Sequence, residues 1–108
     1  MIVLVLKYFV PKGFRGITLF PFVILLQNED RFNQALLNHE KIHIRQQLEM
    51  LILPFFIWYS VEFTIRFFQF RNAKVAYQNI SFEKEAYVNE KDLGYLKQRP
   101  LWSFSKYI

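Results

Sequence analysis

Residues 33–50 read NQALLNHEKIHIRQQLEM, and they contain both histidines of the 108-residue chain. Asp30, just before this segment, and Asn33, its first residue, are candidate N-caps, and they predict a helix over about residues 32–50. The three- and four-residue spacing places one set of side chains on a common face, namely Leu36, His39, His43, Gln47 and Met50. The same spacing predicts a solvated face formed by Asn38, Lys41, Arg45 and Glu49.

Within this segment, His39, Glu40 and His43 form an H-E-x-x-H pattern. Residues four apart on a helix project from one side, so both imidazoles can bind one Zn²⁺. Zinc lowers the pKa of its water toward ~7, and a neighbouring carboxylate can take the proton as the water attacks a carbonyl. The pattern predicts His39 and His43 as metal ligands and Glu40 as the catalytic base. The alternative is a pair of surface histidines on an amphipathic helix.

A catalytic zinc normally has a third protein ligand. The chain has no cysteine and no further histidine, so this ligand must be a carboxylate. The candidates are Glu29, Asp30, Glu49, Glu62, Glu83, Glu85, Glu90 and Asp92. A ligand from a separate helix makes the best site, and Ser81 is placed to cap a helix over about residues 82–96.

Two apolar segments near the N-terminus predict β-strands, residues 1–10 (MIVLVLKYFV) and residues 17–26 (ITLFPFVILL). Pro21 cannot donate to a ladder and therefore predicts that the second segment is an edge strand. Residues 71–79 predict a polar connection.

Residues 48–70 (LEMLILPFFIWYSVEFTIRFFQF) are the most apolar stretch and are long enough to cross a bilayer, which takes about 20 residues. Pro54 predicts a kink, and Glu62 and Arg66 are expected to pair at i,i+4. A helix that lies in the membrane interface or packs on a partner protein remains the alternative.

The aromatic fraction of 19% and the net charge of +5 favour membrane lipid, and the aromatic, basic tail LWSFSKYI is an expected interfacial anchor. The basic residues form no run, so no nucleic-acid partner is expected.

The motif Asn38-His39-Glu40-Lys41-Ile42-His43, followed after 39 residues by Glu83-Lys84-Glu85-Ala86-Tyr87, resembles the gluzincin metalloproteases. It is similar in particular to minimal gluzincin cores and to the membrane CAAX prenyl protease and HtpX-like groups. The resemblance implies that Glu83 is the third zinc ligand, with Glu85 as the competing choice. Tyr87 stands where the family usually has an aspartate that orients a zinc-binding histidine, and its hydroxyl is the candidate substitute.

The resemblance covers about residues 17–92 and implies a mainly α fold with a small β element: edge strand, HExxH helix, long hydrophobic helix and glutamate helix. The length predicts one domain over residues 1–108. The implied function is a zinc metallopeptidase in a bacterial inner membrane, with its site facing the cytoplasm and a peptide or membrane-protein substrate added to the edge strand. A second hypothesis stays open, a non-catalytic zinc-stabilised membrane protein or a small subunit of a larger membrane complex, because the chain is short. Glu40 favours the enzyme.

Overall fold

A computed structural model describes all 108 residues of the chain as a mainly helical protein with one small sheet. The strands are β1 (Ile2–Val5), β2 (Gly16–Leu19) and β3 (Phe22–Leu25), in the order β1-β3-β2. β1 runs parallel to β3, and β2 runs antiparallel to it. The prediction of an α+β fold with a small β element is confirmed at this level.

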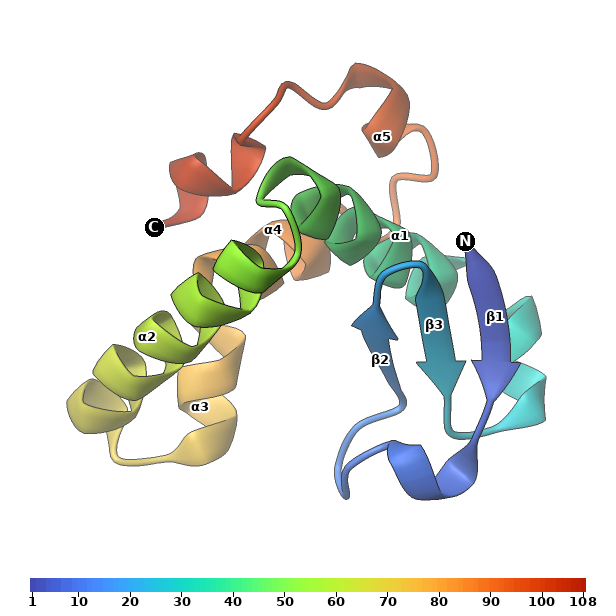
Figure 1. The fold of residues 1–108 in the computed structure, drawn as a ribbon, viewed down its shortest axis with the longest axis horizontal. Helices are drawn as coiled ribbons and strands as arrows, with labels where there is room; N and C mark the ends of the chain where they lie inside the picture. The colour runs from blue at the N-terminus through green and yellow to red at the C-terminus, as the bar shows by residue number, and fades with distance from the viewer.

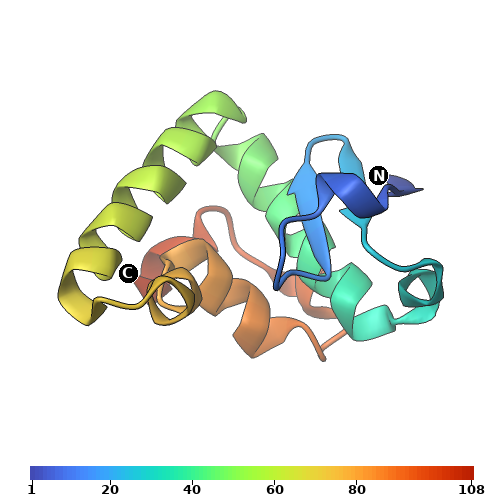
Figure 2. The same cartoon turned by 90° about the horizontal axis from the view of Figure 1, so that it is seen from below.

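The helices surround a central one (Figure 1). They are α1 (Gln34–Glu49), α2 (Leu53–Phe70), α3 (Ala73–Gln78), α4 (Ser81–Asn89) and α5 (Tyr95–Gln98), with short 3-10 turns η1 (Lys7–Phe9), η2 (Asn28–Phe32) and η3 (Ser103–Tyr107). α1 runs between the sheet on one side and α2 on the other, as both views show (Figures 1 and 2). α4 packs against α1, and α3 packs against α2.

The prediction of one edge strand over residues 17–26 is wrong, because this segment is a hairpin. β2 and β3 pair with Leu19 opposite Phe22, and Phe20 and Pro21 form the turn between them. Proline cannot donate to a ladder, so it is accommodated where the chain reverses. β2 nevertheless lies at the edge of the sheet, next to α1.

α1 and α2 are separated by a sharp break. Leu51 and Ile52 both have a φ of 58°, a conformation that is uncommon for residues with side chains. Pro54 lies in the first turn of α2, where its missing N–H has no cost. It therefore starts the helix and does not kink it as predicted. No individual helix has the length and hydropathy to cross a bilayer; α1 and α2 qualify only as a pair, which is bent by 113°.

The predicted pair between Glu62 and Arg66 does not form, since Glu62 binds α4. Its carboxylate accepts hydrogen bonds from the Ser81 backbone N–H (2.5 Å), the Ser81 hydroxyl and Trp58 Nε1 (2.8 Å). Arg66 donates to Gln69 (2.9 Å). The first N–H groups of a helix lack an internal partner, so Glu62 caps α4 from α2, and Ser81 is its first helical residue.

Two further predicted elements are corrected by the helices of the second half. The polar connection over residues 71–79 contains α3, which Asn72 caps by accepting from the Val75 N–H (3.1 Å). The helix predicted over residues 82–96 ends at Asn89, and α5 follows after a turn. One apolar core cluster consists of Met50, Phe55, Ile80, Phe82 and Phe104, and other buried apolar residues lie in β3 and α1. Phe104 lies in the C-terminal tail, so this residue serves the core.

Candidate metal centre

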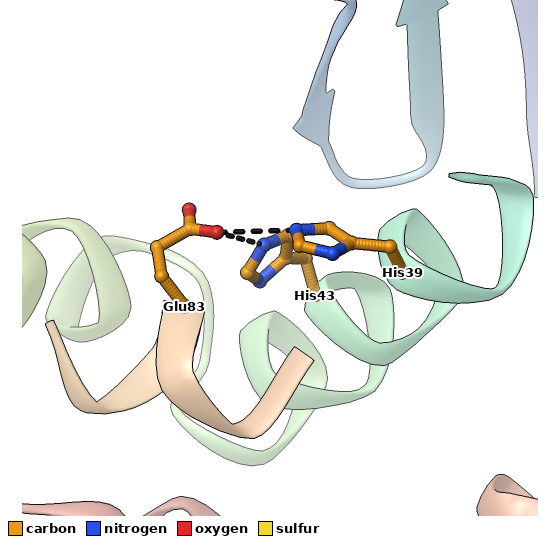
Figure 3. Close-up of side chains that lie close together, drawn as sticks. All are labelled: His39, His43 and Glu83. Carbon is orange, nitrogen blue, oxygen red and sulfur yellow. Dashed lines mark hydrogen bonds and ion pairs between the residues drawn. The ribbon is translucent and has the colours of Figure 1, made fainter. Parts of the chain in front are cut away.

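Two helices bring three metal-binding side chains together. α1 supplies His39 and His43, and the first turn of α4 supplies Glu83, all pointing toward one another (Figure 3). Glu83 Oε1 lies 3.1 Å from His39 Nε2 and 3.0 Å from His43 Nε2. The three donor atoms lie within 4.8 Å of one another, and all three residues are buried. This group is able to hold a metal ion.

Hydrogen bonds orient both imidazole rings toward this centre. His39 Nδ1 donates to Glu90 Oε1 (2.8 Å), and His43 Nδ1 donates to Gln46 Oε1 (2.7 Å). Because these acceptors bind the Nδ1 hydrogens, Nε2 is the ring atom of each histidine that faces the shared position beside Glu83. Contacts of this kind fix the tautomer and the ring angle of a histidine ligand.

The remaining oxygen of Glu83 is bound by α2. Tyr59 donates its hydroxyl hydrogen to Glu83 Oε2 (2.8 Å). Burial and the Glu83 charge raise the pKa of Tyr59 above its usual range, so the phenol keeps its proton and remains a donor. This contact leaves Oε1 as the oxygen that faces the two imidazoles.

The centre is electrostatically coupled without a metal. Burial alone lowers the pKa of His43, but the charge and hydrogen bond of Glu83 outweigh it and raise the pKa to about 9. Burial alone raises the pKa of Glu83, but His43 and the hydrogen bonds from both histidines lower it far below its usual range. The metal-free site therefore holds an ionised Glu83 beside a protonated His43 at neutral pH.

Glu40 lies next to the centre and against β2. Thr18 donates its hydroxyl hydrogen to Glu40 Oε2. At Gly16, an added Cβ would lie 3.2 Å from the Ile24 carbonyl oxygen and 3.4 Å from Glu40 Oε1. Glycine therefore allows the strand to approach Glu40, and the buried carboxylate is held between the metal ligands and the edge strand.

A cleft leads to these residues from two sides. A cavity of about 760 Å³ is lined by His39, Glu40 and Glu90, and a second of about 340 Å³ is lined by Glu40, His43 and Glu83. α1 forms the floor, β2 and the preceding loop form one wall, and α2 and α3 form the other. Phe14 and Tyr77 belong to both cavities and meet edge to face, with ring centroids 4.8 Å apart.

Glu85, the competing ligand in the sequence, points away from the metal group. Its carboxylate accepts hydrogen bonds from Gln46 Nε2 (2.8 Å), Tyr95 (2.6 Å) and the Arg99 guanidinium (Nη2, 3.1 Å). Arg99 also donates to Glu49 (2.6 Å). Burial raises the pKa of Glu85, but these hydrogen bonds and the Arg99 charge lower it below its usual value. Glu85 therefore binds the C-terminal segment to α4.

Gln46 connects this ion pair with the metal group. Its Nε2 donates to Glu85 Oε1 (2.8 Å) and the Phe82 carbonyl (3.1 Å), so its amide oxygen faces His43. Two acceptors beside one nitrogen fix the orientation of the amide. The C-terminal segment thus supports the angle of the His43 ring through Glu85 and Gln46.

Glu90, and not Tyr87, binds the Nδ1 atom of a candidate histidine ligand. The Tyr87 hydroxyl lies 3.4 Å from the Tyr77 hydroxyl, and the Tyr87 ring packs edge to face on His39 with centroids 4.5 Å apart. It is the Glu90 carboxylate, two turns after Glu83, that binds His39 Nδ1.

Asn38 was expected on the solvated face of α1, but it is buried and donates to the Asn89, Glu90 and Asp92 carbonyls. Asn38 thereby holds the segment that carries Glu90.

The other candidate acids lie outside the metal group. Asp30 is buried and paired with Arg15, Glu29 and Asp92 are exposed, and Glu49 and Glu62 have the partners described above. Sequence reasoning missed the supporting roles of Glu90, Gln46 and Thr18. A spacing of seven residues between Glu83 and Glu90, and of three between His43 and Gln46, was the available signal.

Comparison with known proteins gives no further identification: no family model, curated protein or solved structure matches this chain.

Proposed function

We propose that this chain is a zinc-dependent metallopeptidase of the gluzincin type. The observation that carries the proposal is the convergence of His39 Nε2, His43 Nε2 and Glu83 Oε1, with Glu40 from the same turn of α1 at the floor of a cleft. Two imidazole nitrogens and one carboxylate oxygen are a donor set typical of catalytic zinc. The hydrogen bonds of Glu90, Gln46 and Tyr59 leave one donor atom of each ligand free for the metal.

Zinc bound here would polarise a carbonyl and lower the pKa of a water molecule. In that chemistry Glu40 would be the general base, the group that takes a proton from the attacking water and returns it to the leaving amine. Thr18 holds one carboxylate oxygen of Glu40 by a hydrogen bond. The other oxygen, Oε1, lies next to Gly16 on the cleft side. His39, His43 and Glu83 hold the metal, and burial excludes bulk water from them.

The proposed substrate is an extended peptide that pairs with the outer edge of β2. The Arg15 carbonyl accepts from the Leu26 N–H, so in this antiparallel pair the backbone groups of Gly16 and Thr18 turn outward. Gln47 already binds the Thr18 carbonyl (2.9 Å) and the Phe20 N–H (2.7 Å). The edge beside Gly16, next to Glu40, is therefore the part that a substrate strand would extend.

The decisive test compares Glu40→Gln with the unaltered chain. We expect both proteins to bind one zinc per chain by elemental analysis, and we expect only the unaltered chain to cleave a fluorogenic peptide library. Thr64→Ala, at an exposed position of α2, serves as a control with unchanged activity. Cleavage that persists in purified Glu40→Gln protein would remove Glu40 from its role, and a chain that binds no zinc would refute the proposal.

A second candidate function is a zinc-stabilised membrane protein, or a small subunit of a larger complex, without hydrolysis. The burial of all three ligands favours it, because structural zinc sites are closed. Under this alternative both the unaltered chain and Glu40→Gln bind zinc, and neither form cleaves any peptide in the library.

A further inference from the structure

Folding makes the surface of this protein more cationic than its net charge of +5 suggests. Only two of the nine acidic side chains, Glu29 and Asp92, are exposed, whereas ten of the fourteen basic side chains are exposed. Most of the other acids lie in or beside the metal group, at the cap of α4 or in the ion pairs with Arg99, and Asp30 pairs with Arg15. The exposed surface therefore fits an anionic partner.

The outer face of α2 is predominantly apolar, with the exposed Ser60 and Thr64 as its polar residues. This face is formed by side chains that are each more than half exposed: Leu53, Ile57, Val61, Ile65 and Phe68. The two charged residues of α2 lie outside this face: Glu62 is buried against α4, and Arg66 is half-buried and binds Gln69. A water-exposed helix normally has the opposite distribution, with charges outside and apolar residues inside. The outer face is therefore built to contact an apolar medium.

Aromatic and basic groups border the two ends of this face. At its N-terminal end, Leu51 is 78% exposed at the corner before α2, and the tail contributes the exposed Leu101 and Trp102. Trp58 packs on Phe104 with centroids 5.5 Å apart, which places η3 and its exposed Lys106 beside α2. At the C-terminal end, Arg71 and Lys74 are exposed where α2 passes to α3.

We propose that the outer face of α2, as defined above, docks on the surface of an anionic lipid bilayer, with the helix lying in the plane of the interface. Amphipathic helices bind in this way when a continuous apolar face is bordered by basic residues. Tryptophan is enriched at the membrane–water interface, where the helix would lie. A second copy of the chain is disfavoured as the occupant, since two strongly cationic surfaces repel each other. A nucleic acid is disfavoured as well, because it binds through cationic groups and aromatic stacking, and this face is uncharged and mainly aliphatic.

The geometry gives this docking a consequence for the cleft. The inner side of α2 contributes Tyr59 and Phe63 to the walls of the cavities. The lipid surface and the metal group would therefore lie on opposite sides of one helix. This proposal does not depend on zinc or hydrolysis, so either can fail without the other.

The test is vesicle flotation of the full chain, purified without added lipid. Vesicles of neutral phosphatidylcholine are compared with vesicles that contain about 30% phosphatidylglycerol. The matched variants are Ile57→Ser/Val61→Ser/Phe68→Ser on the face and Tyr8→Ser/Phe9→Ser/Phe32→Ser on exposed apolar residues elsewhere. Circular dichroism and urea unfolding check that both variants remain folded.

We expect the chain to float with the anionic vesicles, and we expect the α2 variant to bind at least about tenfold more weakly than the control variant. Binding is also expected to shift the emission of Trp58 and Trp102 to shorter wavelength. Equal binding of both variants would overturn the proposal. So would a chain that forms a stable dimer through this face or binds nucleic acid in preference to anionic vesicles.

Discussion

Replacing Glu90 by alanine is expected to weaken zinc binding about tenfold to one hundredfold while leaving the protein folded. The change removes the carboxylate that accepts from His39 Nδ1 at 2.8 Å. A hydrogen bond to a charged group contributes about 1.5–3 kcal/mol, and about 1.4 kcal/mol corresponds to a factor of ten. The Glu90 side chain is 24% exposed, so the lower half of this range applies. Glu90→Gln keeps an acceptor without the charge and is expected to have an intermediate effect.

The assay is competition for zinc with a chromophoric chelator of known affinity, run on metal-free protein at constant pH. Tyr87→Phe is the matched control, because it keeps the ring that packs on His39 and removes only the hydroxyl. We expect this control to bind zinc within about twofold of the unaltered chain. The reasoning fails if Tyr87→Phe loses as much affinity as Glu90→Ala, since Tyr87 would then orient the histidine as the family resemblance suggested.

Three other substitutions or conditions test separate parts of the site. Glu83→Gln is expected to lower zinc affinity more than Glu85→Gln, which instead lowers stability by removing one of the two carboxylates that pair with Arg99; chelator competition and urea unfolding distinguish the two, and the reverse ranking reassigns the third ligand. Arg99→Met is expected to cost about 3–5 kcal/mol in urea unfolding, because the carboxylates of Glu85 and Glu49 stay buried without a cationic partner, and adding Glu85→Gln and Glu49→Gln is expected to restore most of it. The pKa of His43 is raised to about 9 in the metal-free protein, so the stability that this proton provides is complete below pH ~6.5 and is lost as the pH rises through 9. Zinc must displace the same proton, so its apparent affinity is expected to rise about tenfold per pH unit up to pH ~9, and a flat profile in titrations would contradict the coupling.

The parts of this fold that follow from short sequence spacings were predictable. A helix carrying His39, Glu40 and His43 needs only an N-cap and a helical period, and Asn33 caps α1 by accepting from the Leu36 N–H (3.1 Å). The placement of Glu83 was an inference from family resemblance, and the structure brings it to the two histidines. A motif on one helix fixes its own geometry, because neighbouring turns determine it.

The parts that depend on contacts between distant segments were not predictable from one sequence. Glu62 and Arg66 have the spacing of an ion pair, but the open end of α4 offers Glu62 three donors. Glu85 has the position of a metal ligand, but Arg99, fourteen residues later, turns it away. In both cases a buried charge takes the partner that the tertiary fold supplies, and a spacing rule carries no information about that partner.

The interior of this protein explains why its site and its surface have opposite character. Of the 25 buried residues, 13 are polar or charged, so polar groups fill about half of the interior. Most of the acids are drawn inward, because the metal group, the cap of α4 and the Arg99 pair each need carboxylates. Because most acids are buried and most basic residues are not, the exposed charges are mainly positive. A protein of this size that builds a carboxylate-rich centre from a basic sequence thus has a mainly cationic exterior, and under the docking proposal the exposed apolar face of α2 would direct this exterior to an anionic lipid surface rather than to anions in general.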